Sequence, residues 1–315
     1  MTSHQLDLFL DSREVTLAND VVAAFRNGDC GRAQDALAAL RAEAPARADL
    51  PAFDSLLAFL ERDRDTDCAP LDGDRLEQLV GEIDTTVAPA SRALGGEAQG
   101  FLNRIWRKLA AAAARQPFDR ARPQTHAAAL YLRGQAHAEA EAEAEAAAAA
   151  AASSIADGWR DPVILRWRAL ARYRVGGLQA ARWQVFSLAW FAADGFPGLL
   201  RELAAPQLED DWRCFQAEVE MPDATWFPAW CLLAHPEFGA ALAGETSPLV
   251  RQAAEGIPGL LAFLVLTGIL AIEPGGYSRA LIEERARLRA IDAGFFAAYM
   301  RSRAAGHRQH GDRRP

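Results

Sequence analysis

Arginine and aromatic side chains alternate in one short segment, from Trp159 to Trp183, which holds six arginines and a single acid. Guanidinium groups form bidentate hydrogen bonds with phosphates, and both guanidinium groups and aromatic rings stack on bases. The segment therefore predicts a site for an anionic ligand or a nucleic acid. Its candidate residues are Arg166, Arg168, Arg172, Arg174, Arg182, Trp167 and Tyr173.

The same segment also has a purely structural interpretation. Trp167 and Trp183 would then be core residues, and the arginines would pair with the acidic stretch 61–84, which holds nine acids and three arginines. The two interpretations differ in whether the guanidinium groups are open to a ligand.

A second candidate site is the pentapeptide 5–9, which combines a polar amide with apolar anchors. Gln5 can donate and accept hydrogen bonds at the rim of a pocket. Leu8 and Phe9 can fill a concave apolar site, while Leu6 covers its rim and Asp7 keeps the peptide soluble.

The pentapeptide QLDLF resembles the motif by which bacterial replication and repair proteins dock on the DNA polymerase sliding clamp. This resemblance implies a clamp-binding tether formed by residues 5–9. The alternative is a first core helix, because Leu6, Phe9, Leu10, Leu17 and Val21 would share one helical face and Phe9 would then be buried.

Motifs for catalysis are missing from the sequence. There is no G-x-x-x-x-G-K-[ST] phosphate loop, no H-E-x-x-H pair and no G-x-S-x-G elbow. His126 and His137 lie near one helical face, but no cysteine or acid accompanies them at ligand spacing. We therefore expect no catalytic residue, no metal and no cofactor, and we favour a non-enzymatic protein.

Composition narrows the class of protein further. The chain has 315 residues, a net charge of −8 and a pI near 5.4, and 50% of it is hydrophobic, which excludes wholesale disorder. The acidic balance disfavours a globally basic nucleic-acid binder. The four cysteines form no CxxC pair and the N-terminus shows no secretory leader, so we expect a cytoplasmic protein.

One apolar run raises the question of a membrane. Seventeen uncharged residues lie between Glu255 and Glu273. A transmembrane helix needs about 20 apolar residues, whereas this run is shorter, starts with Gly256 and Pro258, and has acidic flanks. We predict a buried core helix over 257–272 and no membrane partner; a membrane segment is the alternative.

Helical periodicity runs through much of the chain. Two segments, 23–45 and 166–194, resemble tetratricopeptide-type hairpins, with a small residue in the first helix, a glycine turn, an alanine in the second helix and a later proline. The matching residues are Ala24, Gly28, Ala33 and Pro45, and then Ala171, Gly176, Ala181 and Pro197. The resemblance implies helical pairs that stack on their neighbours as a solenoid.

These patterns predict an all-α fold, a helical-hairpin (tetratricopeptide-like) solenoid with a helical C-terminal part. An alanine-rich helix is expected over 125–153. The expected organisation is N-terminal hairpins over 1–65, an acidic Gly/Pro-rich linker or edge over 66–100, a main helical domain over 101–302 and a basic disordered tail over 303–315.

The function predicted from these features is that of a non-enzymatic bacterial adaptor in the cytoplasm. It would bind a protein partner through a helical groove, with residues 5–9 as a tether to the sliding clamp. The alternatives are a nucleic-acid-binding protein that uses the segment 159–183, or an accessory subunit of an enzyme.

Overall fold

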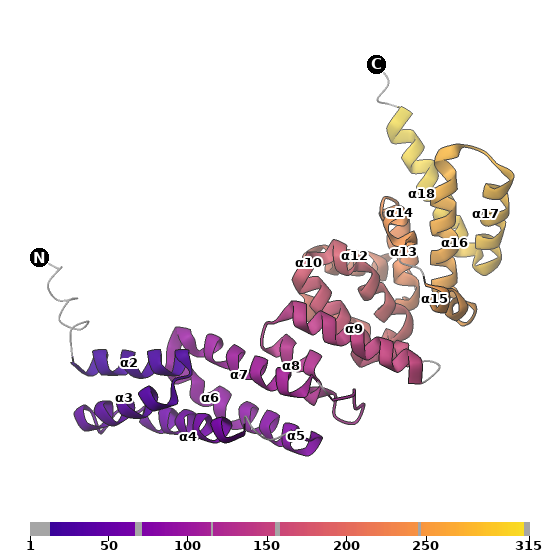
Figure 1. Ribbon diagram of the computed structural model, residues 1–315. Helices are drawn as coiled ribbons and strands as arrows, with labels where there is room; N and C mark the ends of the chain where they lie inside the picture. Colours follow the sequence, from indigo (N-terminus) through magenta and orange to yellow (C-terminus); the bar gives the residue numbers. More distant parts are fainter. Residues whose placement is uncertain (1–12, 67–70, 115, 155–157, 245–246, 312–315) are drawn as a thin grey trace, which may run out of the picture. The chain divides into compact units, whose positions relative to one another are not determined.

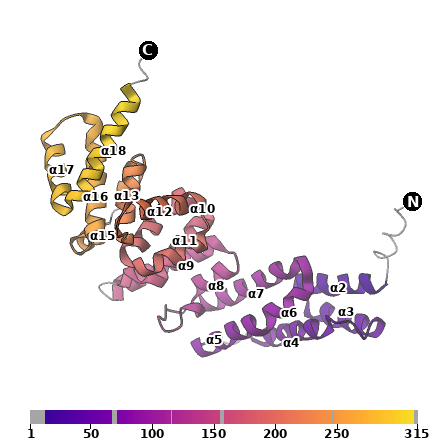
Figure 2. The same ribbon diagram turned by 180° about the vertical axis from the view of Figure 1, so that it is seen from behind.

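The computed structural model describes residues 13–66, 71–114, 116–154, 158–244 and 247–311. These residues form helices and turns, and none of them lies in a β-strand, which confirms the all-α prediction. The chain divides into two compact units, 1–143 and 144–315 (Figures 1 and 2). The boundary between them falls inside one helix, α9 (His137–Ser154), and not in the segment 66–100.

Unit 1 is a set of short helices around one core. Its elements are α2 (Arg13–Asn27), α3 (Cys30–Glu43), α4 (Leu50–Thr66), α5 (Gly73–Glu82), the π-helix Ile83–Val87, α6 (Ala88–Ser91), the 3-10 turn Arg92–Glu97, α7 (Ala98–Ala113), the 3-10 turn Pro123–Thr125 and α8 (Ala127–Arg133). Phe25 on α2 stacks on Phe53 of α4 with ring centroids 6.0 Å apart, and it meets Phe101 of α7 edge-on at 6.0 Å. The three rings pack α2, α4 and α7 together in one core.

The first hairpin forms where the sequence predicts it. Gly28 adopts a positive φ of 70°, which reverses the chain after α2 at little steric cost. Asp29 then caps α3, because its carboxylate accepts a hydrogen bond from the backbone N–H of Arg32 at 3.0 Å. The apolar faces of the two helices close on each other through Val21, Phe25 and Leu37, which are buried.

The acidic segment that the sequence suggests as a linker is helical and belongs to the core of unit 1. Leu76, Ile83, Val87 and Leu94 are buried there. Their spacing places them on one face, while the acids that dominate the composition lie on the exposed side. The acidic composition suggested a linker, whereas the spacing of the apolar residues is that of a helix.

The expected alanine-rich helix over 125–153 is interrupted. The chain turns at Gly134 and Gln135, and Gln135 takes a φ of 53°, so α8 and α9 are separate helices. The turn packs on α7, where a Cβ atom at Gly134 would lie 2.9 Å from the Arg107 side chain. Arg107 Nε donates to the Gly134 carbonyl at 2.7 Å, which closes the end of α8.

Unit 2 begins inside α9 and contains the helices that follow it. They are α10 (Pro162–Phe191), α11 (Phe196–Leu203), α12 (Pro206–Glu218), α13 (Phe227–Ala234), α14 (Phe238–Ala243), α15 (Pro248–Ala253), α16 (Pro258–Ile272), α17 (Arg279–Ile291) and α18 (Ala293–Gly311), with 3-10 turns at Gly158–Arg160, Ala193–Gly195, Ala224–Trp226, Ala254–Gly256 and Glu273–Gly275. The helix α18 continues through part of the segment 303–315 that the sequence suggests as a disordered tail.

Inside α10 the helical path breaks at Gly177, whose φ is 71°, so the predicted turn is present. The two halves fold back on each other, because Trp159 and Phe191, from opposite ends of the hairpin, have ring centroids 4.9 Å apart. Trp183, Trp190 and Phe186 of the second half all pack against Phe263 of α16.

The apolar helix α16 forms in the predicted run, and its inner side is buried. Phe263, Leu266 and Ile269 are inaccessible to solvent, whereas Leu264 lies half-buried on the outer side. By length and composition alone, 258–275 could cross a membrane, and 44% of this stretch is buried within the protein. Its apolar character is therefore partly explained by its contacts inside unit 2.

Candidate protein-binding groove

The arginines of the segment 159–183 are mostly engaged within unit 2. Arg166 binds the Glu202 carboxylate through Nε at 2.8 Å and through Nη2, and Arg168 Nε lies 2.8 Å from Glu145 Oε1. Their partners come from helices packed nearby and not from the acidic stretch 61–84. Trp167, with 6% of its surface exposed, is a core residue.

Two other candidate arginines, Arg174 and Arg182, also have neighbours within unit 2. The Arg182 guanidinium lies 3.3 Å from the ring centroid of Phe238, and burial lowers its pKa. Arg174 Nη2 donates to the Glu202 carbonyl at 3.3 Å, while Arg172 and Tyr173 are half-buried. Arg166, Arg168, Arg174 and Arg182 thus contact acids, a carbonyl or a ring of unit 2, while Arg166 and Arg174 remain exposed.

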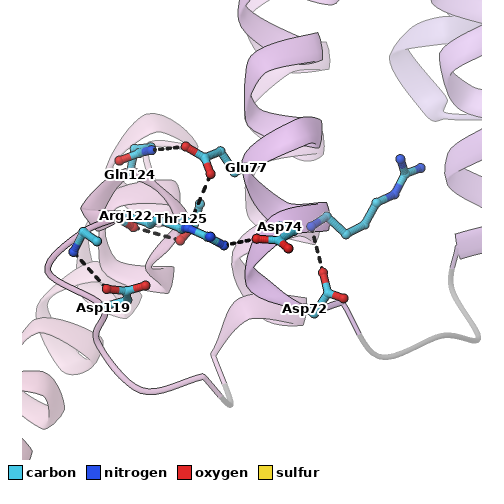
Figure 3. Close-up of polar contacts among 9 residues, drawn as sticks. Asp72, Asp74, Glu77, Asp119, Arg122, Gln124 and Thr125 are labelled. Carbon is cyan, nitrogen blue, oxygen red and sulfur yellow. Dashed lines mark hydrogen bonds and ion pairs between the residues drawn. The ribbon is translucent and has the colours of Figure 1, made fainter.

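The acids of unit 1 have their own arginine partners (Figure 3). Arg122 contacts Asp74 and also Glu77, which lies 3.4 Å from its Nε. Arg133 contacts Asp84 at the far end of the stretch. These pairs hold the loop after α7 against α5 and the end of α8 against the π-helix Ile83–Val87.

The pentapeptide Gln5–Leu6–Asp7–Leu8–Phe9 lies outside the described residues. The first residue after the pentapeptide that the structure describes is Arg13, where α2 begins.

Unit 2 contains a groove of about 770 Å³ between α12, α13 and α18. A volume of this size is typical of ligand sites. Its walls come from three stretches that are distant in the sequence, 215–221, 226–234 and 292–302. The side chains that define it are Phe215, Glu218, Glu220, Met221, Trp226, Trp230, Leu233, Asp292, Phe295, Ala298 and Arg301.

Two aromatic pairs line the groove. Phe215 and Trp230 have ring centroids 5.8 Å apart, and Trp226 and Phe295 have centroids 5.4 Å apart. The two tryptophans are four residues apart, so they lie on one side of the first turn of α13. Both remain half-buried, and Met221 at the edge exposes 86% of its surface. An apolar ligand would therefore meet rigid rings and a flexible thioether.

The rim of the groove is acidic. Glu218 accepts a hydrogen bond from the Trp230 indole N–H at 2.9 Å, and Asp292 accepts one from the Phe295 backbone N–H at 2.6 Å. Within the described part of the chain, neither these two acids nor Glu220 forms an ion pair. One arginine, Arg301, opposes the three carboxylates.

His235, Asp211 and Cys231 are polar groups that lie together at α13. His235 Nε2 lies 3.0 Å from Asp211 Oδ1, but burial raises the pKa of the nearby Cys231 thiol well above its usual value, so the thiol stays protonated. No group of three or more potential metal ligands gathers within the described ranges.

No protein-family model, curated protein or solved structure matches this chain. Function is therefore argued from the residues and their geometry. Sequence reasoning missed the groove, because its residues become neighbours only after α12, α13 and α18 pack together. The sole local signal was the pair of tryptophans in 226–230.

Proposed function

We propose that the protein is a non-catalytic adaptor that holds a segment of a partner protein in the groove of unit 2. The groove itself carries the proposal, because half-buried aromatic rings at its centre and charged residues at its rim are the anatomy of a protein-binding site. The helical hairpins 13–43 and 158–191 support a tetratricopeptide-like scaffold, whose usual role is to present such surfaces.

The second part of the proposal is a tether at the N-terminus. Gln5, Leu8 and Phe9 match the clamp-binding pattern, which implies a tether that docks on the clamp by its side chains. The adaptor would then bring its partner to the DNA polymerase sliding clamp in the cytoplasm. This part rests on the sequence pattern.

The arrangement does not favour direct nucleic-acid binding. Arg166 and Arg168, two of the five candidate arginines, pair with Glu202 and Glu145. In both pairs a carboxylate lies beside the guanidinium group, and its negative charge opposes a phosphate at the same place. The acidic rim of the groove would also repel phosphates.

Random-peptide display on the purified full-length chain tests the groove. Ala298→Trp would fill the groove from α18, whereas Ala297→Trp adds the same ring on the exposed neighbouring position. We expect a peptide consensus that enriches on the wild type and on Ala297→Trp but not on Ala298→Trp. If every enriched peptide binds all three proteins equally, the groove is not a protein-binding site.

A further inference from the structure

We propose that the occupant of the groove is a basic amphipathic helix of the partner, with leucine or aromatic anchors on one face and lysine or arginine beside them. The inference rests on the proposed function and names the chemistry of its partner.

The apolar part of the argument comes from the shape of the groove. Trp226, Trp230 and Phe295 form an apolar wall of the groove, and Met221 adds a flexible side chain at its edge. The backbone of a partner could not cover this wall, so its side chains would have to do so. An amphipathic helix places anchors at every third and fourth residue and lays them in one line, which suits a groove between packed helices. Burying such anchors excludes water from the tryptophan faces.

The charge of the partner follows from the rim. Residues 215–221 line one side of the groove, and the stretch 206–223 that contains them holds six acids and one arginine. Several of these acids serve the fold: Asp211 binds His235, and Asp223 caps the turn before α13. Glu218 and Glu220 have no basic partner among the described side chains, although they border the apolar wall. A positively charged ligand would neutralise them.

The same carboxylates argue against other occupants. Phosphates of a nucleic acid would be repelled by Glu218, Glu220 and Asp292. Arg301 offers a single guanidinium, which leaves the lining negative overall. Three of these four charged residues of the lining are acidic, so an acidic peptide would be repelled.

Calorimetry on the full-length protein with two synthetic probes tests this inference. One probe is an amphipathic peptide of leucine and lysine, about 15 residues long so that it can form a helix; the other carries glutamate in place of lysine. The test variant is Glu218→Gln with Glu220→Gln, because glutamine can still accept the bond from Trp230. The matched control is Glu209→Gln with Glu255→Gln, which removes two exposed acids outside the groove.

We expect the lysine probe to bind the wild type and the control with similar affinity, and to bind the test variant about tenfold more weakly. It should not bind Ala298→Trp. An equal loss in the test and control variants would show attraction to net charge alone and would overturn the inference.

The remaining outcomes separate this inference from the proposed function. Groove-dependent binding of the glutamate probe would overturn the basic partner and leave the adaptor intact. Absence of any groove-dependent peptide, from the two probes and from the display experiment, would overturn both. A dimer of the wild type that Ala298→Trp abolishes would assign the groove to a second copy and would also overturn the inference.

Discussion

His126 shows how one buried side chain couples stability to pH. It precedes α8, and its Nδ1 accepts a hydrogen bond from the backbone N–H of Ala128 at 3.2 Å. Protonation would turn this acceptor into a donor and break the cap. Burial lowers the pKa of the imidazole to about 4, against a usual value of 6.5.

The sign of the pH dependence follows from this lowered pKa. Between pH 6.5 and 4 the unfolded chain binds a proton that the folded chain does not, so the stability present above pH 6.5 is lost as the pH falls. From pH 7 to 5 we expect His126 to cost about 2 kcal/mol of unfolding free energy. His126→Asn keeps a capping side chain and should lack this increment. Urea unfolding of both proteins at the two pH values measures it; parallel losses would contradict the assignment.

Two arginines of α7 cap other helices through contacts that local sequence patterns do not predict. Arg104, on α7, donates to the Phe25 carbonyl at 2.7 Å and also contacts the Arg26 carbonyl, and so closes α2. Arg107 closes α8 in the same way. The residues involved are separated by up to 79 positions. Arginine side chains are mostly exposed in proteins. Only the packing of α7 shows that Arg104 and Arg107 cap the ends of other helices.

The helix α16 contains two glycines that meet opposite surroundings. A Cβ atom at Gly259 would lie 2.2 Å from the Thr225 carbonyl oxygen, because the first turn of α16 packs directly on the backbone before α13. A Cβ atom at Gly268 would have no such neighbour within 4 Å. One helix thus offers a comparison between close packing and helix propensity.

The same substitution at the two sites should change stability in opposite directions. Gly259→Ala forces backbone to separate, and we expect a loss of roughly 1–3 kcal/mol. Gly268→Ala removes a flexible residue from a helix interior, with a gain of roughly 0.5–1 kcal/mol. Chemical denaturation of both variants measures these changes. Equal effects at both positions would mean that α16 does not pack against the turn 224–226.

Helices with a regular apolar face were predictable, and their ends were predictable where glycine reverses the chain. The helices 13–27 and 98–113, and the turns at Gly28 and Gly177, follow from such local signals. The helical segment 73–97 was not expected, because its acidic composition masked a buried face. The break at Gly134 depends on a contact with α7 that no local pattern contains.

Across the chain as a whole, the groove and the pentapeptide carry different parts of the proposed adaptor. The groove could not be predicted, because residues 215 and 301 come together only through the packing of α12, α13 and α18. The pentapeptide was visible at once, because a short linear motif needs no fold to be recognised. The two sites share no residue, so we expect changes in one to leave binding at the other unaltered.

Docking of residues 5–9 on a bacterial sliding clamp tests the tether directly. Leu8→Ala with Phe9→Ala removes both apolar anchors, and central anchors of a small interface carry about 2 kcal/mol or more each. We expect this variant to lose clamp binding in calorimetry and to keep the melting temperature of the wild type. Leu17→Ala serves as the converse control: Leu17 packs on the core of unit 1, so its loss should lower the melting temperature and leave clamp binding unchanged. If Phe9 instead completes a core helix, the double variant will melt several degrees lower and the wild type will show no heat of binding to the clamp.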